Sequence, residues 1–212
     1  MTELKPLKIT CTSSDCSNNL HCFLKVGKLK NNTTGGQCRT CGAELIDWVR
    51  VYRCDPSDME HTFRSLKLEL IRHHFWHIPM TDRLTNYALK KGRPILRQAA
   101  ENQIRRSIGS AAPFRDGYQT PREDSLKANP IHYAQHATAS CCRKCLEEWH
   151  GIPQCRELTG DEISYLTSLV MLYLEERVQQ LTDFPQRLRA RRKRPPLPQP
   201  GQEMGSQPGY AA

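Results

Sequence analysis

Cysteine and histidine side chains gather in two parts of this chain, and both groups have the spacing of metal ligands. Of the 10 cysteines, six lie before residue 55 and four lie after residue 140. Clustered cysteines outside an oxidising compartment usually hold a metal ion, and zinc is the usual ion for mixed thiolate and imidazole sites. We therefore expect the protein to bind one or two Zn²⁺ ions.

The first group predicts a structural zinc site. The run Cys38-Arg-Thr-Cys41 is a zinc knuckle, and the Gly42 that follows lets backbone N–H groups turn toward the sulfurs. A second, earlier pair would complete four ligands and leave no open coordination position, which indicates a structural role. The expected ligands are Cys11, Cys16, Cys38 and Cys41, with His21 or Cys22 as the replacement for Cys11 or Cys16.

The second group predicts another metal site at the start of a short helix. Cys142 and Cys145 lie one helical turn apart, and a helix N-terminus stabilises thiolates. His136 before the helix and His150 at its end are the expected third and fourth ligands. Because His150 would lie about 7 Å along the helix axis from Cys145, Cys141 is the alternative ligand.

A third set of residues consists of His73, His77 and Asp116. The two histidines are four residues apart, so they share one face of a helix, and they continue an apolar stripe that predicts an interior position. Two interpretations stay open. The histidines either pack in the core or form a functional cluster with Asp116 and Tyr118.

The net charge of +9 is concentrated near the C-terminus, where residues 187–194 carry six of these charges. A zinc-stabilised module that contacts DNA or RNA phosphates is therefore the leading functional prediction. The expected contacts in the tail are Arg189, Arg191, Arg192, Lys193 and Arg194. A basic stretch on a predicted helix would add Lys90, Lys91, Arg93, Arg97, Arg105 and Arg106.

Two other classes of function stay open. The first is a metal-dependent enzyme of unknown reaction, with its site around residues 113–150; three protein ligands plus water would favour it over a structural site. The second is a protein-interaction adaptor, since Arg194-Pro195-Pro196-Leu197-Pro198 suits polyproline recognition. The sequence contains neither a Gly-rich phosphate loop nor a Gly-x-Ser-x-Gly motif.

The sequence pattern around these residues predicts an α+β fold that is mostly α. We expect a zinc-ribbon-like module over residues 1–54, a helical domain over residues 55–184 and a disordered basic tail over residues 185–212. A strand is predicted over residues 45–52. Helices are predicted over residues 57–78, 82–91, 94–108, 141–150 and 159–181, and residues 109–135 are predicted to form a loop. No apolar run is long enough to span a membrane and no signal peptide is recognisable, so a cytoplasmic protein is expected.

One long motif carries a resemblance to a known family. Residues 134–152 read Ala-Gln-His-Ala-Thr-Ala-Ser-Cys-Cys-Arg-Lys-Cys-Leu-Glu-Glu-Trp-His-Gly-Ile, after Asp116-Gly117-Tyr118-Gln119-Thr120-Pro121 and Asn129-Pro130. Residues 60–183 thereby resemble a small bacterial domain family of unknown function. The resemblance implies no activity, and it makes the module over residues 9–54 and the tail additions to the family's domain. The residues that match the family's motif include His136, Cys141, Cys142, Cys145, Trp149 and His150.

Overall fold

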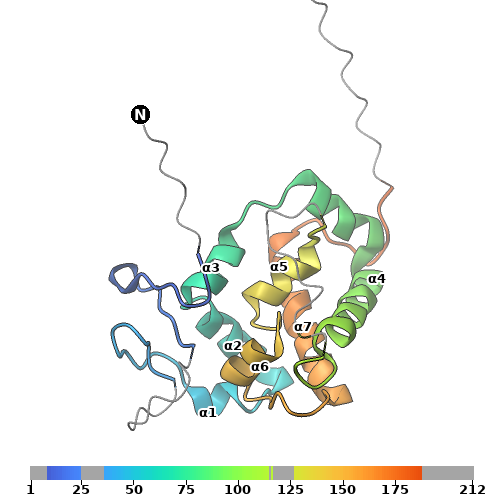
Figure 1. Ribbon diagram of the computed structural model, residues 1–212. Coiled ribbons are helices and arrows are strands. Elements are labelled where there is room, and N and C mark those ends of the chain that lie inside the picture. Colours follow the sequence, from blue (N-terminus) through green and yellow to red (C-terminus); the bar gives the residue numbers. More distant parts are fainter. Residues whose placement is uncertain (1–8, 25–35, 115, 117–126, 188–212) are drawn as a thin grey trace, which may run out of the picture.

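Helices build most of the computed structural model, which describes residues 9–24, 36–114, 116 and 127–187 (Figure 1). Within these ranges there is no sheet, and isolated β-bridges pair Asp15 with Leu20 and His21 with Glu69. The prediction of a mostly helical fold is confirmed. The β component of that prediction is not found in the described part of the chain.

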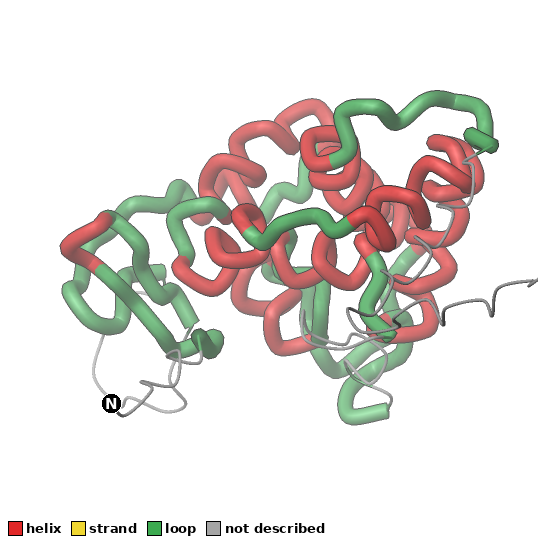
Figure 2. Tube along the Cα trace, turned by 90° about the horizontal axis from the view of Figure 1, so that it is seen from above, coloured by secondary structure: helices red, strands yellow, loops and turns green. Residues whose placement is uncertain are grey.

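The N-terminal part consists mainly of loops and lies to one side of the helices (Figure 2). Its regular elements are the short 3-10 helix η1 (Cys16–Asn18) and one helical turn, α1 (Trp48–Val51). The strand predicted over residues 45–52 is wrong, because Asp47 caps α1 by accepting a hydrogen bond from the backbone N–H of Arg50 at 3.1 Å. A β-branched and aromatic run forms a strand only beside a partner strand, and this segment has a helix cap instead.

Four helices form the core of the remaining described chain. α5 (Pro130–Ala137) packs against α3 (Leu70–His77), α4 (Asp82–Ile108) and α7 (Gly160–Arg177), and α4 also packs along α7. Their apolar faces enclose side chains such as Phe75, Leu96, Ile104, Leu166 and Leu169. The other elements are η2 (Pro56–Asp58), α2 (Met59–Leu66) and α6 (Arg143–His150).

The helix predicted over residues 57–78 is broken into α2 and α3 at Glu69. Glu69 has an extended backbone, with φ −91° and ψ 125°. The backbone N–H of His21 donates to Leu68 O at 2.8 Å, and the N–H of Leu70 donates to His21 O at 2.9 Å. A contact with the N-terminal part therefore interrupts the helix. At the break, the Glu69 carboxylate lies between the N-terminal part and the helices and accepts a hydrogen bond from the backbone N–H of Phe23.

Two other predicted helix boundaries are confirmed, whereas α6 begins at Arg143, two residues later than predicted, and α7 ends at Arg177, four residues earlier. Gly92 interrupts α4 with φ 67°, between the two helices predicted over residues 82–91 and 94–108. A Cβ atom at this position would lie 2.8 Å from the backbone carbonyl carbon of Phe184. Thr159 and Glu162 form a capping box at the start of α7, where a helix is predicted to begin. The sequence analysis missed α5, although Asn129 and the Pro130 that follows it are typical of a helix start.

No helix within the described ranges is both long enough and apolar enough to cross a bilayer.

Candidate metal centres

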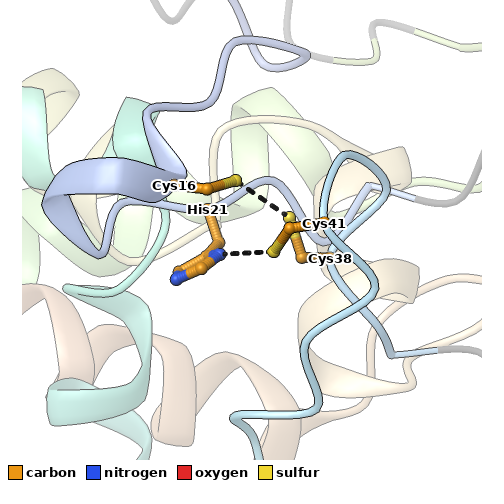
Figure 3. Close-up of side chains that lie close together, drawn as sticks. All are labelled: Cys16, His21, Cys38 and Cys41. Atoms are coloured by element: carbon orange, nitrogen blue, oxygen red, sulfur yellow. Dashed lines mark hydrogen bonds between the residues drawn. The ribbon is translucent and has the colours of Figure 1, made fainter.

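Four side chains of the N-terminal part converge on one point (Figure 3). The sulfurs of Cys16, Cys38 and Cys41 and a ring nitrogen of His21 all lie within 4.8 Å of one another. Cys16 Sγ is 3.7 Å from Cys38 Sγ, and Cys41 Sγ is 3.4 Å from His21 Nδ1. With Zn–S bonds of about 2.3 Å and Zn–N bonds of about 2.0 Å, the edges of a tetrahedral zinc site measure about 3.8 Å between sulfurs and about 3.5 Å between sulfur and nitrogen. These two separations are therefore close to those of a zinc site, and the remaining ones are at most 4.8 Å.

The backbone of the Cys38 knuckle follows from its sequence. The N–H of Gly42 donates to Cys38 O at 2.8 Å, and the N–H of Cys38 donates to Ala43 O at 2.9 Å, which closes a tight loop. Gly42 has φ 75°, a conformation that glycine adopts without strain. Burial opposes ionisation of Cys38, but backbone N–H groups that include those of Thr40 and Cys41 bond to its sulfur and lower its pKa to about 6. The knuckle thus favours the thiolate that binds metal.

His21 is held from both sides so that Nδ1 faces the sulfurs. Its Nε2 lies 3.0 Å from Asn19 Oδ1, and an Nε2–H that donates to this amide oxygen leaves the Nδ1 lone pair for a metal ion. Asn19 adopts the left-handed conformation with φ 57°, which brings its side chain back toward the ring. The bridge between His21 and the chain around Glu69 fixes the backbone.

Of the four cysteines expected to bind the first zinc ion, the structure brings Cys16, Cys38 and Cys41 together. The fourth member of the cluster is His21, which the sequence offered as an alternative ligand. Cys11 lies apart from this cluster, and its backbone oxygen accepts a hydrogen bond from Cys22 Sγ at 3.2 Å. Cysteine spacing alone favoured Cys11, whereas the fold favours the histidine.

The second cluster comprises the thiols of Cys141, Cys142 and Cys145, which lie within 4.8 Å of one another at the start of α6. Hydrogen bonds from the thiols of Cys11, Cys141 and Cys142 lower the pKa of Cys145 well below its ordinary value, and the nearby guanidinium of Arg72 lowers it further. These surroundings favour the thiolate form of Cys145.

A buried ion pair lies beside this second cluster. Arg72 is 1% exposed, Glu69 is 2% exposed, and Nε of the first lies 2.9 Å from Oε2 of the second. The other arm of Arg72 donates to Cys145 Sγ at 3.1 Å. Glu69 also accepts bonds from the backbone N–H of Phe23 and from Nε1 of Trp149. The sequence analysis did not single out Arg72; a charged residue on the buried side of a helix was the available signal.

The two histidines predicted as ligands near α6 are not in the second cluster. The ring of His136 stacks on Phe75 with centroids 4.4 Å apart. His150 Nε2 lies 3.0 Å from Thr138 O, and burial lowers the pKa of His150 to about 4. Cys141, which the sequence offered as the alternative, is in the cluster instead.

His73, His77 and Asp116 do not form the buried cluster that the sequence suggested. His77 is exposed and His73 is half-buried, because α3 buries Arg72 and its neighbours instead. The two imidazoles stack on each other at 3.9 Å. Asp116 Oδ1 accepts a hydrogen bond at 2.5 Å from the backbone N–H of Arg143, at the N-terminus of α6, and Tyr118 lies outside the described residues.

Two basic residues of α4, Arg93 and Arg105, have carboxylate partners. Arg93 forms ion pairs with Glu175 and Asp183, and Arg105 forms one with Glu101. The tail residues predicted to contact nucleic acid, and the proline-rich run beside them, lie outside the described residues.

A cleft of about 570 Å³ is lined by residues that include Tyr52, Cys54, His150 and Tyr165, yet neither thiol cluster opens into it. Cys54, in this cleft, donates from its sulfur to His150 O at 3.3 Å.

Comparison with known families gives one match. Residues 60–175 match a family model described as a domain of unknown function, DUF4186. No solved structure matches the chain. The matched range includes α6 and the second cluster, whereas the cluster around His21 lies before it.

Proposed function

Because this chain belongs to the DUF4186 family, whose description names no activity, we infer its function from its own side chains and propose that it is a zinc-binding protein. The Cys16–His21–Cys38–Cys41 cluster supports this proposal most directly, since its S–S and S–N separations of 3.7 Å and 3.4 Å are close to those of a tetrahedral zinc site. Three cysteines and one histidine are a known ligand set of structural zinc sites.

A zinc ion in this cluster would be structural. Three sulfurs and one nitrogen complete a tetrahedron, so no position would remain for substrate or water. The surrounding segment has little regular structure within the described residues, and the metal would supply the cross-links that a larger core supplies elsewhere. Its role would be to fix His21, and with it the bridge to Glu69.

The test is the zinc content of purified full-length protein, measured by native mass spectrometry and elemental analysis. We expect bound zinc in the wild type and one ion fewer in a Cys38→Ser variant. Cys155→Ser is the matched control, because Cys155 is exposed and belongs to neither cluster, and it should keep the wild-type zinc content. A wild-type protein without zinc, purified with zinc present throughout, would contradict the proposal.

We also propose that the zinc-stabilised protein associates with nucleic acid. The support is its charge, because six of nine net positive charges lie in residues 187–194. The ion pairs of Arg93 and Arg105 within the helical domain reduce what α4 could add. Binding would therefore depend mainly on the tail and would consist of phosphate contacts without sequence readout.

Salt dependence tests this second proposal. If the tail makes about six phosphate contacts, affinity for generic DNA or RNA should fall about a thousandfold between 50 and 200 mM salt. Deleting residues 186–212 should abolish most of the binding. Absence of binding at about 50 mM salt would contradict the proposal, and unchanged binding after the deletion would move the contacts to the folded part.

The alternative function is a metal-dependent enzyme centred on Cys141, Cys142 and Cys145. The observation that favours it is that three thiols converge there, and three protein ligands with one open position are typical of catalytic zinc. Whether a fourth protein ligand closes this site therefore separates the enzyme from the structural interpretation.

A further inference from the structure

A second cleft, of about 440 Å³, is lined by both halves of α4 and by the start of α5. Its lining carries three positive charges, from Lys91, Arg105 and Arg106, and none of the described residues that line it carries a carboxylate. The polar lining also includes the amide side chains of Asn102, Gln103 and Asn129. A cleft lined by charges of one sign concentrates their field, so this cleft favours an anionic ligand.

The kink at Gly92 brings these charges to one cleft. Lys91 and Arg105 are 14 residues apart in the chain, and a straight α-helix would separate them by about 21 Å. Gly92 has φ 67° and ψ 166°, which are not helical, so the chain changes direction between the two residues. Side chains from both sides of the kink therefore line the same cleft.

The structure divides the basic stretch of α4 into residues with different surroundings. Arg93 forms ion pairs with carboxylates, and Arg97 donates to α7 at 3.0 Å. Lys90 is exposed and does not line the cleft, although it precedes Lys91 directly. A charge run that the sequence shows as continuous thus contributes only some of its members to this cleft.

Two of the three cations are held by contacts with α4 itself. Arg106 Nη2 donates to Gln103 Oε1 at 3.2 Å, and Arg106 Nε donates to Asn102 O at 3.4 Å. Lys91 Nζ lies 5.0 Å from the centroid of the Tyr87 ring, which is a cation–π contact. These contacts restrict both side chains before any ligand arrives, which lowers the entropy cost of binding.

Few negative charges compete with a ligand for these cations. Within the described part of the chain, Lys91 and Arg106 form no ion pair. Arg105 Nη2 lies 2.7 Å from Glu101 Oε1, but this pair is exposed, and exposed ion pairs contribute little, so an anion can displace it. Most of the positive charge of the cleft is therefore available to a ligand.

We propose that this cleft binds a small phosphate monoester. Its phosphate contacts Lys91, Arg105 and Arg106. Its organic part packs against Ala99 and Ile131, the aliphatic residues of the lining. A phosphate monoester carries about two negative charges and three acceptor oxygens, and a guanidinium can donate two parallel hydrogen bonds to such a group.

The size of the cleft suits this class of ligand. A volume of about 440 Å³ lies in the range of small-molecule sites and leaves room for more than a phosphate group. The cleft includes no member of either thiol cluster and no residue of the basic tail, so the proposal goes beyond the zinc-binding and nucleic-acid functions proposed above.

The first experiment titrates phenyl phosphate into the full chain at low salt and follows binding by calorimetry. Wild-type protein should bind this monoester saturably and more tightly than benzoate, which has the same ring but one charge and two oxygens. Absence of saturable binding, or equal affinity for benzoate, would overturn the proposal.

Two matched pairs of variants locate the site. Arg106→Gln should weaken phenyl phosphate binding by at least about tenfold, whereas Arg97→Gln, which removes the same charge from the same helix outside the cleft, should leave it unchanged. Lys91→Gln should also weaken binding, and Lys90→Gln should not. Equal effects within either pair would mean that only the overall charge matters and would overturn the proposal.

A single-stranded oligonucleotide separates this cleft from the contacts proposed for the tail. In wild-type protein, an excess of the oligonucleotide should not displace phenyl phosphate. The affinity for the oligonucleotide should be the same in Arg106→Gln as in Arg97→Gln. Displacement, or a selective loss of oligonucleotide binding in Arg106→Gln, would assign the cleft to nucleic acid and overturn the small-molecule site. Failure of phenyl phosphate to bind would leave the zinc and nucleic-acid proposals intact.

Discussion

The two thiol clusters differ in where their ligands come from and in what surrounds them. The ligands Cys16 to Cys41 lie in one stretch of the chain, in a region of loops, and Cys41 is exposed. Cys141 and Cys145 are buried in a hydrophobic cluster that also contains Cys38, and the buried Arg72 donates to both of their sulfurs. The comparison indicates that the first site would create the local fold around it, whereas the second would add to a helix, α6, whose Leu146 and Trp149 are already buried.

Glu69 and Trp149 connect these two environments. Glu69 accepts from the N–H of Phe23 at 3.3 Å and from Trp149 Nε1 at 2.8 Å, so one carboxylate bonds to both the N-terminal part and α6. The ring of Trp149 packs against Phe23 and Trp48, with centroids 5.9 Å and 5.2 Å apart. Loss of either metal site should therefore change the same interface from opposite sides.

Removing zinc should have the largest effect and should separate the two regions most clearly. Structural zinc in small modules contributes about 10–16 kcal/mol of apparent binding free energy, and the loops around His21 have no large core to replace it. With a chelator, amide hydrogen exchange should rise sharply over residues 9–24 and 36–48. α4 and α7 should keep their protection, because their packing involves neither cluster. Equal loss of protection in both regions would remove the distinction between them.

Replacing Arg72 should have the next largest effect. Arg72→Met leaves the Glu69 carboxylate buried without its cation, and breaking a buried ion pair in this way costs about 3–5 kcal/mol. Arg64→Met is the matched control, because Arg64 and Glu60 form an exposed ion pair of 3.0 Å, where the expected cost is below about 1 kcal/mol. The measurement is the free energy of unfolding from urea titration.

A double variant sharpens this prediction. Glu69→Gln together with Arg72→Met removes both charges, so the combined loss should be smaller than the sum of the two single losses. Additive losses would mean that Arg72 acts through the cysteine sulfurs alone and that the ion pair contributes little.

Local signals in the sequence predicted the parts of the fold that depend on near neighbours. The glycine at residue 92 and the Thr159–Glu162 capping box each fix a helix boundary within a few residues of chain. The predicted break after residue 91 and the predicted helix start at residue 159 are both confirmed. The pairing of Cys38 with Cys41 in one cluster is of the same kind. These features depend on backbone geometry that a short segment determines by itself.

Contacts between distant segments determined what the sequence analysis missed. The break at Glu69 requires His21 to bond to the backbone on both sides of it, 48 residues away in the chain. The choice of His21 over Cys11 requires the left-handed conformation of Asn19 and that same bridge. Spacing rules count residues along the chain, and they carry no information about a ligand that a distant helix holds in place.

The smallest predicted effect concerns the contact between the regions themselves. Tyr52, which follows α1, donates its hydroxyl to Glu148 O on α6 at 3.1 Å, at a partly exposed position. Tyr52→Phe removes one hydrogen bond and keeps the ring beside Trp48, so the expected cost is about 1 kcal/mol. If the N-terminal part opens as a unit, amide exchange in α1 should become about fivefold faster, while α4 stays as in the wild type. Tyr87→Phe, on α4, is the control. An increase in α1 exchange as large as the one that zinc removal causes would mean that this hydroxyl, and not the metal, holds the two regions together.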